Sequence, residues 1–230
     1  MTTCLITGAN RGIGLELTRH YAARGDAVIA AARDPDRATA LSELGKNNPR
    51  IEIVTLDVTD EKSLARLAAQ LGGRPIERLI ANAGTMGPRG GYADPGHTAA
   101  AWADLLAVNV TGTFFTIRTF APNVLAANGG KVAIISSRMA SSKVANGASY
   151  LYRSSKAAAA NLGANFAAEL KPKGVAVGVY HPGWVKTDMG GAGADITPSA
   201  SAAGLVDRIE RLSLATTGVF EDYAGTAIAH

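Results

Sequence analysis

The feature that most constrains this fold is a regular alternation of short apolar segments with longer stretches that can form helices. The apolar segments are continuous rather than alternating in polarity, which is the pattern of strands buried on both faces. Right-handed helical crossovers between parallel strands provide that burial. We therefore expect an α/β fold: a single-domain Rossmann-like doubly wound parallel sheet with helices on both faces. Strands are expected at residues 3–7, 27–32, 51–56, 78–81, 131–135 and 175–180, helices at 12–24, 61–71, 98–127, 149–170 and 199–212, and loops at 84–97 and 186–198.

The length and composition of the chain exclude several classes of protein. A chain of 230 residues without repeats or linkers fits one domain, expected over residues 1–230. The single cysteine, Cys4, allows no intrachain disulfide, and the start of the chain leaves no room for a signal peptide, so a cytoplasmic location is expected. Charged or amide residues interrupt every apolar stretch, so no membrane span is expected. The net charge of +4 is mild and scattered, which excludes a nucleic-acid face, and the four histidines lack metal-ligand spacing.

A glycine-rich turn follows the first expected strand. The segment T-G-A-N-R-G-I-G places Gly8, Gly12 and Gly14 between that strand and a helix. Glycines at these positions let the backbone turn tightly and approach a pyrophosphate, which the positive end of the helix dipole favours. This context predicts a dinucleotide-binding site.

The end of the second strand bears on the choice of nicotinamide cofactor. An NAD enzyme places an acid there to bind the ribose 2'-hydroxyl, whereas this chain has Ala32 followed by Arg33. Arg11 in the glycine turn can reach the same place, and two guanidinium groups suit a 2'-phosphate. NADP(H) is therefore expected in preference to NAD(H), although a shift of one residue would place Asp34 at the ribose instead.

Tyr152 and Lys156 lie four residues apart on an expected helix, so both side chains emerge on one face. A phenol has a pKa near 10, and bringing it to about 7 needs roughly 4 kcal/mol of stabilisation of the phenolate. A lysine ammonium about 4 Å away supplies about 4 kcal/mol at an effective dielectric constant near 20. The pair can therefore act as an acid and base.

Further polar residues stand where the expected strands end. Ser136 and Ser137 follow the fifth strand, at the sheet edge where such folds bind ligands. The small residues of A-N-A-G, residues 81–84, end the fourth strand and let a cofactor lie close to the backbone. Asn109 falls inside an expected helix, which is unfavourable unless its amide has a specific partner.

Together these motifs resemble the short-chain dehydrogenase/reductase superfamily, in the subgroup with a T-G-x-x-x-G-x-G turn. The similarity extends over the whole chain and includes L-D-V, N-A-G, I-S-S, Y-R-S-S-K and H-P-G-W-V-K-T in the order of the family. The two ends of the chain look most similar to carbonyl reductases of the Sniffer and C-factor type. The resemblance implies transfer of a hydride between NADP(H) and a small carbonyl or alcohol substrate.

The resemblance also implies a role for each matching residue. Tyr152 would protonate the carbonyl oxygen, Lys156 would lower the tyrosine pKa and bind the nicotinamide ribose, Ser137 would hold the substrate oxygen, and Asn109 would hold a water next to Lys156. Asp57 and Val58 would flank the adenine, with Pro182, Gly183, Val185 and Thr187 at the nicotinamide. The full set of implied cofactor contacts is Gly8, Asn10, Arg11, Gly12, Ile13, Gly14, Arg33, Asp57, Val58, Asn82, Ala83, Gly84, Tyr152, Lys156, Pro182, Gly183, Val185 and Thr187.

Several alternatives stay open at this point. The spacing from Ser137 to Tyr152 is longer than is commonest in the family, so Ser136 or Ser141 is a possible catalytic hydroxyl, and Tyr150 is a rival to Tyr152. The competing function is a dinucleotide-binding signalling or regulatory protein without catalysis, because a fold alone does not fix function. A sugar epimerase or dehydratase shares the Tyr–Lys pair but resembles a different glycine spacing.

Two expectations concern the surroundings of the site. Met86, Met139, Trp184 and Met189 are candidate apolar lining residues, and the glycine-rich stretch after Thr187 predicts a small lid that is mobile when empty. In the family the helix at 149–170 and its predecessor form a dimer interface, so a homodimer or homotetramer is expected.

Overall fold

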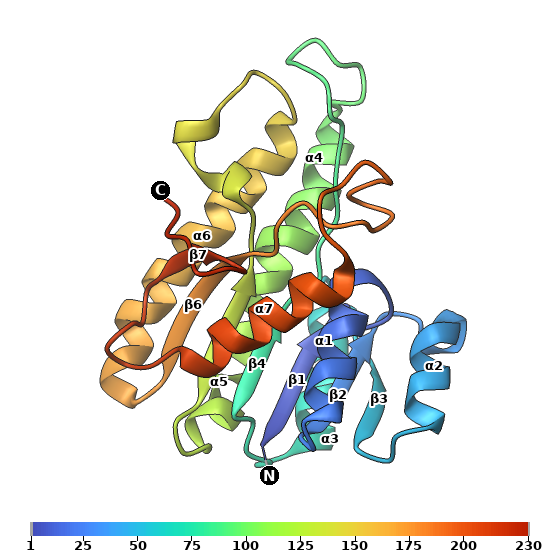
Figure 1. The fold of residues 1–230 in the computed structure, drawn as a ribbon, viewed down its shortest axis with the longest axis vertical. Helices are drawn as coiled ribbons and strands as arrows, with labels where there is room; N and C mark the ends of the chain where they lie inside the picture. The colour runs from blue at the N-terminus through green and yellow to red at the C-terminus, as the bar shows by residue number, and fades with distance from the viewer. Residues whose placement is uncertain (1, 230) are drawn as a thin grey trace.

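A computed structural model describes residues 2–229 and shows one seven-stranded sheet in the order β3-β2-β1-β4-β5-β6-β7. Every neighbouring pair of strands is parallel. The chain starts in the middle of the sheet with β1, builds outward to β3, and then crosses back to build from β4 to β7 (Figure 1). This confirms the expected doubly wound Rossmann-like architecture. The strands are β1 Thr3–Thr7, β2 Ala27–Ala32, β3 Ile51–Thr55, β4 Arg78–Ala81, β5 Lys131–Ile135, β6 Ala176–His181 and β7 Phe220–Asp222.

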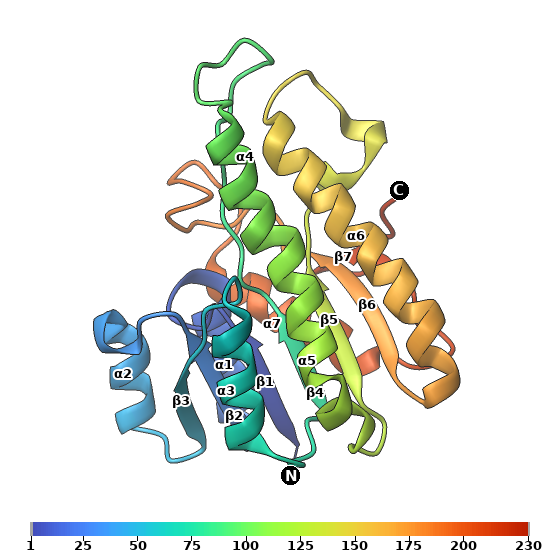
Figure 2. The ribbon, with the colours of Figure 1, turned by 180° about the vertical axis from the view of Figure 1, so that it is seen from behind.

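Helices cover both faces of the sheet. One layer contains α1, α2 and α7, which lie in front of the sheet in Figure 1. The other layer contains α3, the continuous run from α4 to α5, and α6, which are in front in Figure 2. The helices are α1 Gly12–Ala23, α2 Thr39–Lys46, α3 Glu61–Leu71, α4 Ala99–Leu106, α5 Thr113–Leu125, α6 Tyr150–Leu170 and α7 Pro198–Arg211.

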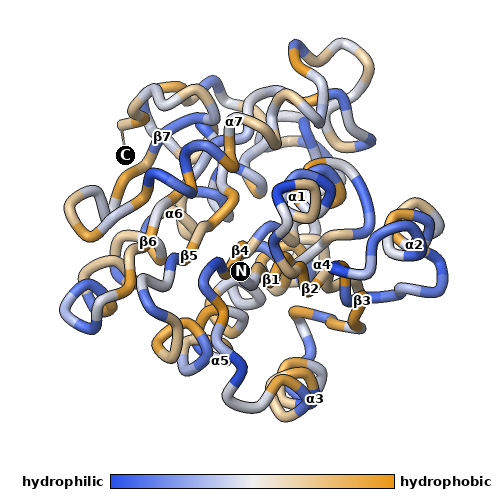
Figure 3. Tube along the Cα trace, turned by 60° about the horizontal axis from the view of Figure 1, so that its bottom comes forward, coloured by the Kyte–Doolittle hydropathy of each residue, from blue (hydrophilic) through white to orange (hydrophobic). Residues whose placement is uncertain are grey.

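Each of the strands β1 to β6 contributes to two hydrophobic cores, which explains their continuous apolar sequences. In β1, Leu5 packs into the core beneath α3, α5 and α6, whereas Cys4 and Ile6 pack into the core beneath α1 and α7. Ile29 and Val28 of β2 divide between the two cores in the same way. The strands therefore run as apolar segments through the middle of the molecule, with polar stretches at the periphery (Figure 3). The buried Cys4 is free, as expected of a lone cysteine.

The structure adds two elements that the sequence pattern did not predict. The α2 helix has only eight residues and fully buries only Leu41, and so short a stretch offers few positions from which a helical period can be recognised. The β7 strand has three residues, F-E-D, and its place at the sheet edge depends on pairing with β6. Both elements are stabilised by tertiary contacts that a local pattern does not reveal.

The expected helix at 98–127 is one continuous run that changes its winding in the middle. Residues Ala107–Gly112 form a π-helical turn between α4 and α5. The run Ala99–Leu125 is long and apolar enough to cross a membrane by length and composition alone, which is weak evidence for a membrane span. Its inward side chains, including Ile117 and Phe120, pack into the core against the sheet.

Candidate active site

The ends of the parallel strands open onto a cavity of about 1060 Å³ at the upper edge of the sheet in Figure 1. The glycine turn after β1, the loops after β2, β3 and β4, the start of α6 and the loop after β6 all contribute to its wall. The structure thus gathers residues from the whole chain at one edge, as parallel α/β sheets do. The expected cofactor residues on this wall are Gly8, Asn10, Arg11, Gly12, Ile13, Gly14, Arg33, Asp57, Val58, Asn82, Ala83, Gly84, Tyr152, Lys156, Pro182 and Thr187.

The glycine turn forms a backbone cradle that side chains would fill. Gly8 and Gly12 have φ angles of 66° and 55°, in the left-handed region that favours glycine. A Cβ atom on Gly14 would lie 2.2 Å from the carbonyl oxygen of Gly8. Asn82 braces the turn by donating from Nδ2 to the carbonyl of Thr7 at 2.9 Å.

The cradle lies at the N-terminus of α1, and this end of the helix suits an anion. The N-cap residue Arg11 makes no side-chain capping hydrogen bond, and no acid lies in the first turn. The first backbone N–H groups and the positive end of the helix dipole therefore face the cavity without a competing carboxylate from the helix itself. These features fit the pyrophosphate of a dinucleotide.

Arginines gather at the far end of the cavity, beyond β2. Arg33 and Arg37 both line it, and Asp34 lies between them in sequence, with its carboxylate 3.7 Å from Arg37. Among residues 2–229 the Arg33 guanidinium has no hydrogen bond or ion pair. Arg37 was not predicted from the sequence, because its place on this wall depends on the short 3-10 helix Pro35–Arg37. Arg11, expected to join this group, is instead 2.7 Å from Asp188.

The opposite end of the cavity is lined by Tyr152, Lys156 and Ser136, whereas Ser137 does not line it. The Tyr152 side chain is buried, and interaction with the Ser137 hydroxyl lowers its pKa. Lys156 is buried as well: its Nζ donates to the carbonyl of Ile135 at 2.9 Å and lies 5.7 Å from the centroid of the Tyr152 ring. One turn of α6 separates the tyrosine from the lysine, as their spacing predicts.

The geometry distinguishes among the alternative residues. The Ser136 hydroxyl donates to the backbone carbonyl of Lys156 at 2.9 Å. The Ser137 and Ser141 hydroxyls each accept from a backbone N–H two residues further on, and of the three serines Ser137 is the one that interacts with Tyr152. Tyr150 is 41% exposed, and its ring stands edge-on to His97 rather than in the cavity. Ser137 is therefore the serine beside the buried tyrosine.

Burial dominates the electrostatics of the tyrosine and the lysine. It raises the pKa of Tyr152 to about 12, although the interaction with Ser137 opposes this shift. It lowers the pKa of Lys156 from 10.5 to about 8. The structure thus differs from the expectation that the lysine brings the phenol towards neutrality, because desolvation of both groups outweighs their mutual effect.

Asn109 lies in the π-helical turn and is completely buried against the loop after β4. Its Oδ1 accepts from the backbone N–H of Thr85 at 2.8 Å, while its Nδ2 donates to the carbonyl of Thr85 at 2.9 Å and to Ser155 Oγ at 3.0 Å. The specific partner that a helical asparagine requires is therefore backbone of the cavity wall. The amide joins that wall to α6.

Some expected residues lie behind the cavity wall rather than on it. Gly183 has a φ of 86° and Val185 is buried, and both contact Ile196 across the loop after β6. Trp184 is half-exposed, with its Nε1 donating to the carbonyl of Gly190. Of the apolar lining candidates, Met86 and Met189 reach the wall, and Met139 and Trp184 do not.

The described residues 2–229 contain no cluster of three metal-ligating side chains.

The shifted pKa of Lys156 gives the protein a pH signature. Between about 8 and about 10.5 the unfolded chain keeps the proton that the folded lysine has lost, so the contribution of Lys156 to stability rises with pH in this window. Burial raises the pKa of Cys4 and Tyr152, so their contributions fall with pH at the upper end of the same window. We therefore expect the midpoints of urea melts to rise more, or fall less, with increasing pH in the wild type than in Lys156→Met; an equal slope in both proteins would contradict the assignment.

Comparisons with known proteins agree with this arrangement. The model of the short chain dehydrogenase family matches residues 2–195. A 1-hydroxy-2-glutathionyl-2-methyl-3-butene dehydrogenase of Rhodococcus sp. (strain AD45) is 34% identical over 241 residues, covering 98% of both chains. The carbonyl reductase Sniffer of D. melanogaster is similar over 100% of both chains, with a TM-score of 0.93 and 26% identity. A carbonyl reductase from Pseudomonas aeruginosa PAO1 in complex with NADP is also similar over 100% of both chains, with a TM-score of 0.89 and 35% identity. With the family model covering most of its length and this fold around its cavity, the chain belongs to the short-chain dehydrogenase/reductase family.

Proposed function

We propose that this protein is an NADP(H)-dependent oxidoreductase of the carbonyl reductase type, acting on a small carbonyl or alcohol substrate in the cytoplasm. The observation that carries the proposal is the contact of Tyr152 with Ser137, beside the buried ammonium of Lys156, at one end of the cavity. The other end of the same cavity holds Arg33 and Arg37. A dinucleotide fits between these two ends.

The cofactor residues divide along the cavity. The backbone of Gly8 to Gly14 would hold the pyrophosphate, and Asp57 and Val58 would flank the adenine. Asn82 to Gly84 would line the adenosine side, and Pro182 to Thr187 the nicotinamide. A bound nicotinamide supplies or accepts the hydride.

Tyr152 would act as the acid in carbonyl reduction. Its pKa of about 12 keeps the phenol protonated at neutral pH, which is the form needed to give a proton to a substrate oxygen as negative charge develops there. Ser137 would donate a hydrogen bond to the same oxygen. Lys156, with a pKa of about 8, is an ammonium at neutral pH and stabilises the phenolate that Tyr152 leaves behind. Asn109, through its hydrogen bonds to Thr85 and Ser155, would hold this end of the wall in place and position a water next to Lys156.

The preference for NADP(H) rests on charge. Arg33 is free of partners within residues 2–229 and can make charge-assisted hydrogen bonds to a 2'-phosphate. Asp34, the residue that would favour a ribose hydroxyl, lies beside the guanidinium of Arg37. The similarity to a Pseudomonas aeruginosa carbonyl reductase in complex with NADP supports the same preference.

Cofactor oxidation tests the proposal directly. Purified protein should consume NADPH with at least some members of a panel of ketones, aldehydes and quinones, and consume NADH more slowly at equal concentration. A regulatory protein on this fold would bind the dinucleotide without oxidising it. Binding without turnover on every class in the panel would therefore favour the regulatory alternative.

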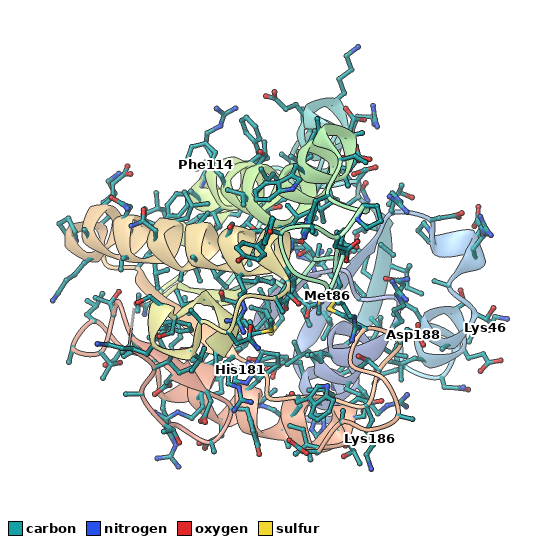
Figure 4. The ribbon with its side chains drawn as sticks, turned by 90° about the horizontal axis from the view of Figure 1, so that it is seen from above. Lys46, Met86, Phe114, His181, Lys186 and Asp188 are labelled. Atoms are coloured by element: carbon teal, nitrogen blue, oxygen red, sulfur yellow. The ribbon has the colours of Figure 1, made fainter. Side chains whose placement is uncertain are left out.

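We also propose that the protein is a homodimer or homotetramer assembled through the outer faces of α5 and α6. Phe114 on α5 contacts Phe166 on α6 at 5.6 Å between ring centroids, and Arg118 lies 4.4 Å from the centroid of Phe115. Figure 4 shows Phe114 on the outer face of the molecule, away from the cavity. Partly exposed aromatic residues in such a cluster suit a subunit interface.

Light scattering tests the assembly. The wild type should have the mass of two or four subunits, and Phe114→Asp should shift it to monomers because it places a charge in the apolar contact. Leu214→Asp adds the same charge at another exposed apolar residue, outside these helices, and should leave the mass unchanged. A monodisperse wild-type monomer would reject this proposal.

A further inference from the structure

The loop after β6 lies directly on the glycine turn. We call residues 186–197 of this loop the strap. A Cβ atom placed on Gly12 would be 3.3 Å from the side-chain methyl of Thr187, so the strap and the turn are in van der Waals contact. The two segments come from opposite ends of the chain and meet at the point of the cavity where the pyrophosphate would bind.

An ion pair joins the same two segments. Arg11 Nη1 lies 2.7 Å from Asp188 Oδ2, and both residues line the cavity. Figure 4, seen from above, labels Asp188 on the strap and Met86 in the loop after β4, and both residues line the cavity. Because Arg11 follows β1 and Asp188 follows β6, the pair reaches across the cavity mouth.

A third segment holds the strap from the loop after β4. Arg89 donates from Nη2 to the carbonyl of Met189, the residue next to Asp188. Within the strap, the backbone N–H of Lys186 donates to the carbonyl of Ile196, and Thr187 Oγ1 accepts from the backbone N–H of Gly190. The strap therefore contacts two other loops of the cavity wall, the glycine turn through Asp188 and the loop after β4 through Met189.

The sign of the charge at Asp188 is informative. The proposed ligand is a polyanion, so a carboxylate on the cavity wall weakens its binding by simple repulsion. Asp188 also neutralises Arg11, which would otherwise be free to bind a phosphate. Asp34, Asp57 and Asp104 also line the cavity, so an acid on this wall is not by itself unusual. Asp188 differs in that its carboxylate pairs with the glycine turn through Arg11, and closure of the strap is the role that accounts for this pair.

We propose that Asp188 is a positioning residue whose ion pair with Arg11 clasps the strap over the bound dinucleotide and slows its release. This inference rests on the proposed binding of NADP(H) to the cavity. Both side chains are largely exposed, with 66% and 78% of their surface accessible, so the pair contributes modestly. Exposed ion pairs of this kind predict a two- to fivefold effect, roughly, on the dissociation rate.

The test is the dissociation rate of NADPH, measured by stopped-flow fluorescence when excess NADP+ displaces it. Asp188→Asn should release NADPH about two to five times faster than the wild type at low salt. Asp188→Glu keeps the charge and should restore much of the slow release. Raising the ionic strength should bring the wild type towards the Asp188→Asn rate, because salt screens an exposed pair.

Asp195→Asn is the matched control, since it removes the same charge from the same strap. The Asp195 side chain makes no ion pair within residues 2–229, so its removal should leave the rate unchanged or slightly lower it. Two results would overturn the clasp. If Asp188→Asn releases NADPH more slowly than the wild type, repulsion between Asp188 and the cofactor is the dominant effect. If Asp188→Asn and Asp195→Asn release NADPH at the same rate, the ion pair with Arg11 has no role in release. Absence of any NADPH fluorescence change with the wild type would instead reject the proposed cofactor, and the clasp with it.

Discussion

Replacing Tyr152 by phenylalanine is expected to lower kcat for carbonyl reduction by about 10²- to 10⁴-fold, the usual contribution of a positioned proton donor. The substitution removes only the hydroxyl that contacts Ser137, and the ring stays packed beside Lys156. The dissociation constant for NADPH should change little, because the glycine turn and the arginines are untouched. Steady-state kinetics with a substrate from the ketone and aldehyde panel measures kcat, and fluorescence titration measures the dissociation constant for NADPH.

Tyr150→Phe provides the control for this experiment. Tyr150 lies two residues away on the same helix, but its ring faces His97 and is partly exposed. Removing the Tyr150 hydroxyl should leave kcat within about twofold of the wild type, because substitutions at the surface away from the active site have small effects on the folded protein. Full activity in Tyr152→Phe, or a large loss in Tyr150→Phe, would show that the proton donor has been misassigned.

Replacing Arg33 by alanine is expected to weaken NADPH binding by about 10- to 100-fold while leaving NADH binding nearly unchanged. A hydrogen bond to a charged group contributes about 1.5–3 kcal/mol, and each 1.4 kcal/mol is a factor of ten. Arg33 has no competing acid among the described residues, so its full charge is available to the extra phosphate of NADPH. Calorimetric titration with both cofactors gives the ratio directly.

The control for Arg33→Ala is Arg66→Ala, on α3, whose guanidinium pairs with Asp60 away from the cavity. It changes the net charge by the same amount and should affect both cofactors equally and slightly. If Arg33→Ala weakens NADH and NADPH binding by the same factor, Arg33 does not recognise the 2'-phosphate. Arg37→Ala then becomes the next variant to examine, because Arg37 shares this end of the cavity.

Local patterns predicted the features that depend on neighbours in sequence. The strand bounds Thr3–Thr7 and Lys131–Ile135 agree with the expected segments because their apolar runs are buried on both faces. The glycine turn and the Tyr152–Lys156 pair are also local, since each lies within one turn of a helix or loop. Interactions between residues close together in the sequence are sufficient to predict such features.

Features that depend on distant contacts were not predictable in the same way. The pairing of Arg11 with Asp188 joins residues from the two ends of the chain, and no spacing rule relates them. The pKa of Tyr152 depends on how deeply the fold buries it, which outweighs the charge of a neighbouring lysine. The place of Arg37 on the cavity wall follows from a single turn of 3-10 helix.

The central claim is that one dinucleotide spans the cavity from the arginines after β2 to the tyrosine at the start of α6. A crystal structure of the protein with bound NADP+ tests it most directly. The account predicts the 2'-phosphate beside Arg33 and Arg37, with the nicotinamide ring next to the Tyr152 hydroxyl. A nicotinamide bound elsewhere, or a Tyr152 hydroxyl turned away from it, would contradict the proposed chemistry.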